Sequence, residues 1–330
     1  MPPSKLPFNT RIQDPPTFKR LFMSISSRLP NEEEWALLHL IHCRDLPTGL
    51  IPPFIDALTL LSIHLLNQPS SDPLFAPNTN RLLLYSVTCL HNLAINNASA
   101  LMSIPETFEL LNSLLDLNTL FKDEMHIKKL SFAILNSLAL NRWLPTGKQL
   151  WLFKKACFYL TNDDRYFVQQ AAQLLSTMIK VNPHHEKQFV FDEIIKYTER
   201  LVQLIVPRGA DIQTTGSSFI DHTLMDQSMI CQILELIFYA TWHSEVIKDI
   251  LYVHPRDVIS ILIYYLGHSQ TEVEGIPMYA ALILNKYPVM DLEIIYRNIQ
   301  VQGNQEWWIE WYTGLCLDSP VVPQLKGDKK

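Results

Sequence analysis

The sequence predicts an all-helical fold of stacked repeats, that is, a helical solenoid. Three observations predict it: apolar residues recur with the period of a helix, glycine is scarce, and similar segments return at regular steps along the chain. The 330 residues include only 9 glycines but 21 prolines. All-β folds need many glycine turns, whereas helical repeats need few and often have proline at helix starts. We find no segment with the apolar–polar alternation of a β-strand.

Helical periodicity is clearest over residues 163–181. Phe167, Ala171, Leu174, Met178 and Val181 are spaced by four, three, four and three residues, which places all five on one helix face. A second apolar stripe lies beside the first one and consists of Val168, Ala172, Leu175 and Ile179. A face this wide predicts a helix with neighbours on two sides.

Start signals place further helices along the chain. Prolines precede several apolar segments, and Asn31 with Glu34 resembles a capping box. The pair Asp163-Asp164 is expected to complement the positive N-terminus of the following helix. Expected helices cover residues 17–27, 31–43, 52–66, 106–116, 124–140 (opened by residue 123 or 124), 146–160, 163–181, 189–205, 226–242, 255–266, 274–286, 292–300 and 305–317. These helices predict one repeat domain over residues 1–318, with a loop at 68–79, a polar insertion at 206–218 and a flexible tail at 319–330.

Composition limits the class of protein. Hydrophobic residues make up 48% and charged residues 18%, as in folded proteins, and the formal net charge of −6 does not fit a dedicated nucleic-acid binder. No stretch approaches the roughly 20 apolar residues that span a bilayer, and no signal peptide is visible. The cysteines form no CxxC pair and fit reduced core residues of a cytosolic or nuclear protein. They are Cys43, Cys89, Cys157, Cys231 and Cys316.

Repetition is the decisive feature. The segment 89–94 (CLHNLA) is similar to the segment 134–139 (ILNSLA), and Leu93 and Leu138 are then 45 residues apart (138 − 93). Weaker similarities continue at steps of 40, about 60 and roughly 46 residues, and the longest step contains the polar insertion. Steps of about 40–47 residues are typical of armadillo and HEAT repeats. We therefore expect Leu93 and Leu138 to be equivalent core positions, each costing roughly 2–5 kcal/mol when truncated to Ala.

One unit resembles the armadillo family directly. In that family a long third helix is followed by a short turn, an Ile-Pro pair and a helix that ends in Leu-Leu. Here residues 90–94 are followed by Ile104-Pro105 and then by Leu110-Leu111. The resemblance implies a right-handed solenoid in which the third helices line a concave groove.

A narrower resemblance covers residues 18–32 (FKRLFMSISSRLPNE), an amphipathic segment followed by Leu-Pro-Asn-Glu and an apolar helix. It is similar to the start of the armadillo-like region in ARID-family subunits of RSC/PBAF-type chromatin remodelling complexes, of the SWI/SNF class. The resemblance implies a nuclear scaffold that binds other subunits of the complex and supports transcription regulation. Those subunits also carry an ARID module, which this sequence lacks, so little or no direct DNA binding is expected. The alternative is an armadillo or HEAT adaptor in cytosolic signalling or nuclear transport.

No chemistry of an enzyme is evident in the sequence. Motifs of hydrolases, zinc proteases and P-loop proteins are absent. His184-His185-Glu186 has no obvious third ligand, and the loop from Gly209 to Gly216 is too loosely spaced to cradle phosphate. We therefore predict a non-catalytic protein with no metal site and no cofactor.

Two features are candidates for partner binding. Asn92 and Asn136 occupy what look like matching positions of two repeats, where armadillo proteins can hold a peptide backbone. The Trp that import adaptors carry one turn earlier is replaced by Thr88 and Phe132, which argues against binding of import signals. The second candidate is an aromatic cluster near the chain end, which either caps the last repeat or docks a partner. Its residues are Trp307, Trp308 and Trp311, together with Tyr312.

Overall fold

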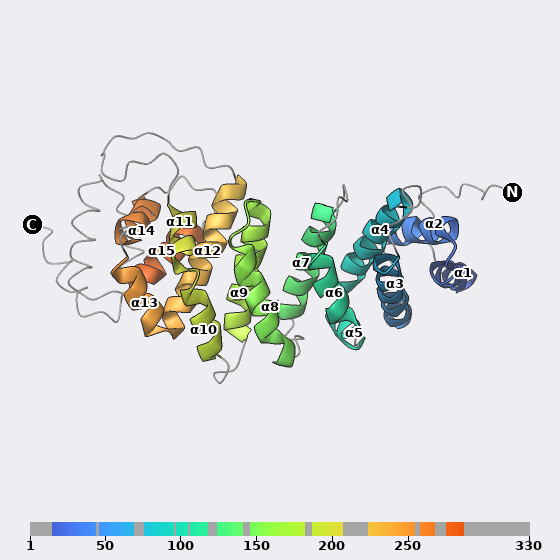
Figure 1. Cartoon of the computed structure of the whole chain (residues 1–330), viewed down its shortest axis with the longest axis horizontal. Coiled ribbons are helices and arrows are strands. Elements are labelled where there is room, and N and C mark those ends of the chain that lie inside the picture. Colours follow the sequence, from blue (N-terminus) through green and yellow to red (C-terminus); the bar gives the residue numbers. More distant parts are fainter. Residues whose placement is uncertain are drawn as a thin grey trace, which may run out of the picture. The chain divides into compact units, whose positions relative to one another are not determined.

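A computed structural model describes residues 15–43, 46–68, 76–95, 97–104, 106–117, 124–140, 146–181, 187–206, 224–254, 258–267 and 275–286. Over these ranges the chain is helical and contains no strand, so the all-helical prediction is confirmed (Figure 1). The α-helices are α1 (Pro15–Ile25), α2 (Pro30–Ile41), α3 (Ile51–Leu66), α4 (Ala76–Ala94), α5 (Ala98–Met102), α6 (Thr107–Leu115), α7 (Glu124–Leu140), α8 (Thr146–Tyr159), α9 (Arg165–Val181), α10 (Lys187–Ile195), α11 (Thr198–Ile205), α12 (Leu224–His243), α13 (Glu245–Tyr252), α14 (Val258–Gly267) and α15 (Gly275–Leu284), and a 3₁₀ turn η1 (Thr48–Leu50) precedes α3.

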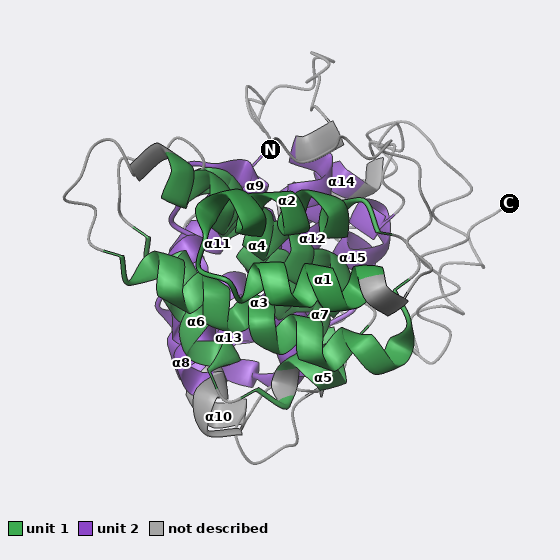
Figure 2. Ribbon diagram, turned by 90° about the vertical axis from the view of Figure 1, so that its right-hand side faces the viewer, with its two compact units in different colours: residues 1–145 green, residues 146–330 purple. Residues whose placement is uncertain are grey.

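The chain divides into two compact units (Figure 2). Unit 1 comprises residues 1–145 with α1 to α7, and unit 2 comprises residues 146–330 with α8 to α15. A single repeat domain over residues 1–318 stays a prediction. Apart from Val206, the polar insertion at 206–218 lies outside the described residues, as do the tail at 319–330 and the helices expected at 292–300 and 305–317.

In unit 1, each helix packs on others from neighbouring parts of the sequence. α1 packs against α2 and α3, α3 against α4, α5 and α6, and α7 against α4 and α6. The contact between α3 and α4 contains a buried polar link, because the hydroxyl oxygens of Ser62 and Ser86 lie 2.8 Å apart. The Ser86 hydroxyl also donates to the carbonyl of Leu58 at 3.2 Å. Both serines are fully buried among apolar side chains.

In unit 2, α9 and α12 form the central pair, and α8 and α15 pack on their outer sides. The wide apolar face predicted for residues 163–181 is confirmed, since both stripes of α9 are buried from Phe167 to Ile179. Val181 ends α9, and its side chain lies outside the described ones. The predicted cap is also confirmed: Asp164 precedes α9, and its Oδ1 accepts a hydrogen bond from the Tyr166 N–H at 2.8 Å.

Several expected boundaries were wrong. The expected capping box does not form, because α2 begins at Pro30, one residue before Asn31, and Glu34 instead pairs with Arg81 of α4 at 2.9 Å. The loop expected at 68–79 is shorter, since α4 begins at Ala76. The helix expected at 189–205 is two helices, α10 and α11, which are separated by residues 196–197. Neither α5 nor α13 was predicted.

The expectation that no stretch reaches membrane-spanning length was wrong for one segment. Thr48–Leu66 is 19 residues long and apolar enough to cross a membrane by length and composition. Half of this window is buried inside the structure, and the buried core helix of a protein passes the same test. Its α3 packs against α1, α4, α5 and α6, so these contacts account for the apolar composition.

The described cysteines are free thiols, as expected. Cys89, Cys157 and Cys231 are buried in helices, and burial raises the pKa of all three thiols, that of Cys231 to about 11. Cys43 differs from the expectation, because it follows the end of α2 and is half-buried.

Candidate partner-binding surfaces

The two asparagines chosen from the repeats do not occupy equivalent places. Asn92 is exposed on α4, whereas Asn136 is buried on α7 with 5% of its surface exposed. With the 45-residue step, Asn92 corresponds to Ser137, and His91 to Asn136. Burial agrees with this register, because Leu90 and Leu135 are both fully buried, as are Ala94 and Ala139. The pairing of Asn92 with Asn136 was therefore wrong by one residue.

A shared peptide-binding row of asparagines is not present at these two positions. Beside Asn92, the ring of His91 lies with its Nδ1 3.3 Å from Asn92 Oδ1. Burial lowers the pKa of His91, and His126 on α7 lowers it further. His91 is therefore held towards its neutral form, which can both donate and accept a hydrogen bond. The aromatic candidates Trp307, Trp308 and Trp311 lie outside the described residues.

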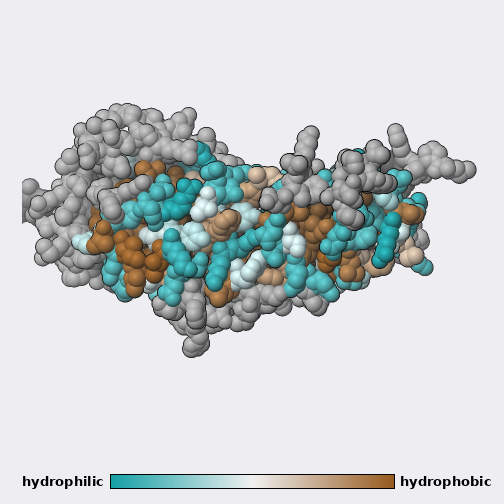
Figure 3. All heavy atoms as spheres, in the orientation of Figure 1, coloured by the Kyte–Doolittle hydropathy of each residue, from teal (hydrophilic) through white to brown (hydrophobic). Residues whose placement is uncertain are grey.

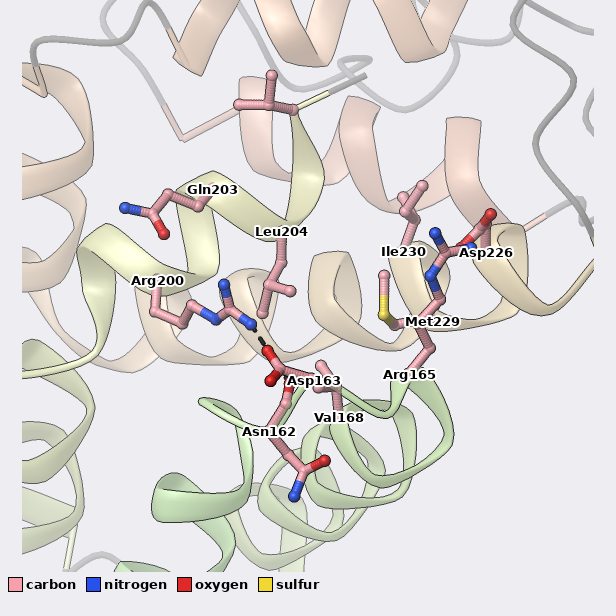
Figure 4. Close-up of a pocket in the computed structure, with 11 residues that line it drawn as sticks. Asn162, Asp163, Arg165, Val168, Arg200, Gln203, Leu204, Asp226, Met229 and Ile230 are labelled. Carbon is pink, nitrogen blue, oxygen red and sulfur yellow. Dashed lines mark hydrogen bonds and ion pairs between the residues drawn. The ribbon is translucent and has the colours of Figure 1, made fainter. Parts of the chain in front are cut away.

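A polar pocket of about 230 Å³ lies in unit 2, between the turn that joins α8 to α9 and the helices α11 and α12 (Figure 4). Arg200 reaches from α11 towards that turn, where its Nε donates to the Leu160 carbonyl at 3.1 Å and its Nη2 to the Asn162 carbonyl at 3.4 Å. On the other side of the pocket, Arg165 of α9 forms an ion pair with Asp226 of α12.

These contacts indicate that the two arginines join elements of unit 2 and do not point to a ligand site. Arg200 binds carbonyls just beyond the C-terminal end of α8, where a cation is favourable. The ion pair between Arg165 and Asp226 ties the start of α9 to the start of α12. Each arginine is thus already held by acceptors of its own unit. In the described residues, no group of three or more His, Cys, Asp or Glu side chains could hold a metal ion.

An apolar pocket of about 440 Å³ lies in unit 1, between α1, the segment before α3, and α3. Phe22 is 37% exposed, and its ring meets that of Phe54 edge to face, with 5.8 Å between ring centroids. We call this site the N-terminal pocket, and its lining consists of Phe18, Lys19, Phe22, Pro47, Leu50, Pro53 and Phe54. Figure 2 shows α1 and α3 running beside each other in unit 1.

Unit 2 exposes an aromatic side chain of its own. Trp242 near the end of α12 is 53% exposed, its ring lies 5.5 Å from that of Phe238, and Lys286 Nζ lies 3.1 Å from its ring centroid. Val246 on α13 and Val253 just after that helix are exposed by 55% and 74%. Figure 3 shows apolar side chains gathering over a part of unit 2, and others over unit 1, with hydrophilic ones between them.

Sequence reasoning missed both exposed apolar sites. Phe22 and Trp242 lie within expected helices, but periodicity does not reveal which helix face lacks a neighbour. Phe18, Leu21, Phe22 and Ile25 form one apolar face at helical spacing. Nothing in that spacing shows that Phe22 stays exposed while the other three are buried.

Comparison with known proteins identifies no family for this chain. No family model matches the chain, and no curated protein matches it. A crystal structure of an engineered protein is similar, with 14% identity over 90% of this chain and 87% of that chain and a TM-score of 0.42. A similarity this low supports neither a detailed fold nor a function.

Proposed function

We propose that the chain is a non-catalytic scaffold subunit of an RSC/PBAF-like, ATP-dependent chromatin remodelling complex in the nucleus. In this role it binds other subunits and supports the regulation of transcription. The observation that carries the proposal is the sequence of residues 18–32, which is similar to the start of the armadillo-like region in ARID-family subunits.

The conformation of this segment is compatible with a binding role. Residues 18–25 belong to α1, which buries Phe18, Leu21 and Ile25 and leaves Phe22 and Met23 exposed, the latter by 61%. Leu29, just before α2, is 55% exposed. Neighbouring apolar side chains that stay exposed favour a surface that a partner covers.

The proposal includes a right-handed armadillo/HEAT-like solenoid as the finer architecture. The packing of sequence-adjacent helices within each unit supports it, as does the agreement in burial between α4 and α7 at most positions of the 45-residue step, the pair Leu93 and Leu138 excepted. Small-angle X-ray scattering tests it. A compact chain of 330 residues has a radius of gyration of about 20 Å, and a solenoid should exceed that value clearly. A value of about 20 Å would contradict the solenoid.

The functional proposal is tested by purification of the tagged chain from whole-cell extract, followed by identification of the proteins recovered. We expect stoichiometric recovery of a remodelling ATPase and its companion subunits. Recovery of import receptors or cytosolic signalling proteins without an ATPase would contradict the proposal and favour a role as an adaptor.

A second measurement concerns DNA. With a net charge of −6, the isolated chain should bind duplex DNA only weakly and without sequence preference at physiological salt, because duplex binding is driven by cationic contacts to phosphate. Tight binding to one sequence in an electrophoretic mobility assay would contradict the scaffold role.

A further inference from the structure

We infer that the N-terminal pocket binds an amphipathic helix of a partner protein, which inserts apolar side chains between α1 and α3 and places a carboxylate against Lys19. This inference rests on the proposed scaffold function and adds the site and the chemistry of the segment that it recognises.

The walls of the pocket determine the kind of partner. Of the three rings in the lining, Phe22 is exposed by 37%, whereas Phe18 and Phe54 are only 5% and 1% exposed. Pro47 and Pro53 have no backbone N–H to donate. A partner that adds a strand needs an open sheet edge, and the described residues contain no strand. Recognition must therefore come from side chains that enter an apolar groove, and an amphipathic helix presents these in a row.

The positive charge of Lys19 at the pocket predicts the charge on the polar face of the partner helix. Lys19 is the one charged side chain in the described lining, and it is exposed. No described carboxylate forms an ion pair with Lys19. The adjacent Arg20 adds a second positive charge, with its guanidinium 4.6 Å from the Trp35 ring centroid, and α1 has no acidic residue. A partner with Glu or Asp beside its apolar residues complements this charge.

The size of the pocket suits this partner. Its volume of about 440 Å³ lies in the range of roughly 300–1,000 Å³ of small-molecule clefts, so it can take up apolar side chains of a docked helix but not the helix itself. The exposed ring of Phe22 packs edge to face on the buried ring of Phe54, and aromatic residues, Phe among them, are enriched at the cores of protein interfaces. Met23 lies next to Phe22 on α1 and is exposed enough to contact a docked helix at the rim.

The direct test uses two synthetic helical peptides of about 18 residues, long enough to form a helix when bound. Both carry Leu at helical spacing on one face. The other face carries Glu in the first peptide and Lys in the second. By fluorescence anisotropy, the full chain should bind the Glu peptide at least about tenfold more tightly than the Lys peptide. Binding of neither peptide, or equal binding of both, would overturn the inference.

Variants of the chain locate the binding. Phe22→Ser should weaken binding of the Glu peptide at least about tenfold, and Lys19→Glu should reverse the preference between the two peptides. The matched control is Leu60→Ser, because Leu60 is an equally apolar side chain on α3, 53% exposed and outside the pocket lining. It should bind as the parent chain does. An equal loss in Leu60→Ser and Phe22→Ser would overturn the inference. Lys19 is exposed, so Lys19→Glu still decides the matter if Phe22→Ser does not fold.

A photo-crosslinking amino acid in place of Met23 in the full chain identifies the natural occupant. The crosslinked peptide, found by mass spectrometry, should be an acidic amphipathic helix of another protein. A crosslink to residues 1–14 of this chain, to a second copy or to a basic segment would overturn the inference.

Failure of the inference and failure of the proposed function are distinguishable. If Phe22→Ser and Lys19→Glu lose the peptide but no ATPase copurifies with the parent chain, the pocket stands and the remodelling role fails. If the ATPase copurifies with the parent and peptide binding is absent, the remodelling role stands and the pocket fails.

Discussion

Truncation of Leu138 to Ala should destabilise unit 1 far more than the same change at Leu93. Leu138 is 1% exposed on α7, whereas Leu93 is only half-buried on α4. A fully buried Leu costs roughly 2–5 kcal/mol when truncated to Ala, because apolar burial is lost and a cavity remains. Part of the Leu93 side chain is already in water, so about 1–2 kcal/mol is expected there. The structure thus corrects the sequence-based expectation of equal costs.

Urea unfolding followed by circular dichroism measures both costs, provided that the slope against denaturant stays constant. In thermal melts, Leu138→Ala should lower the midpoint by roughly 5–15 °C and Leu93→Ala by a few degrees, at about 2–4 °C per kcal/mol. Leu140→Ala on α7 is the control, because Leu140 is 61% exposed and should melt as the parent does. If Leu93→Ala is as costly as Leu138→Ala, the burial assigned to α4 is wrong. If Leu138→Ala melts like the parent, the register of α7 is wrong.

Three further changes test other features. Glu33 is 3% exposed, and burial raises the pKa of its carboxyl above the usual 4.5, so the folded state loses stability as pH rises from that value through the folded pKa. Glu33→Gln should therefore raise the melting temperature at pH 7 but not at pH 4. Equal shifts of the melting temperature at both pH values would refute this. Asp164→Ala removes the cap of α9 and should cost about 0.5–2 kcal/mol in urea unfolding, whereas Asp163→Ala should cost little; equal costs would contradict the assigned cap. Iodoacetamide reacts with the thiolate, so it should label Cys231, whose pKa is about 11, far more slowly than the half-buried Cys43. Mass spectrometry measures both rates. Faster labelling of Cys231 would show that this side chain is not buried as described.

The sequence was most informative where a helix is long and buried on a wide face. In α9, two apolar stripes alternate over many turns, and both proved to be buried. The five residues of α5 are too few for a period to show. Residues 196–197, which separate α10 from α11, include neither Gly nor Pro, so no breaker marked the gap. The start of α13 did carry a signal, since Ser244 is its N-cap and accepts from the Ile247 N–H at 3.3 Å.

The candidate sites were less predictable, for physical reasons. The similarity between residues 89–94 and 134–139 fixes a step of 45 residues, but the asparagines were matched at 44, and a shift of one residue turns a side chain by about 100° around a helix. That is enough to exchange the exposed Asn92 for a buried position. The N-terminal pocket depends on Pro47 and Phe54 meeting Phe18 from α1, a tertiary contact that no local pattern encodes.

The buried hydroxyl pair between α3 and α4 also fixes how far one helix can slide along the other. Apolar surfaces are non-directional, so two Leu-rich helices could pack almost as well after a shift of one turn, about 5.4 Å. Such a shift would separate Ser62 from Ser86 and break the bond from Ser86 to the Leu58 carbonyl on the other helix. Each lost hydrogen bond between the helices is worth about 0.5–1.5 kcal/mol. The two serines thus set the register between α3 and α4, because they favour one alignment among several that hydrophobic burial alone would allow.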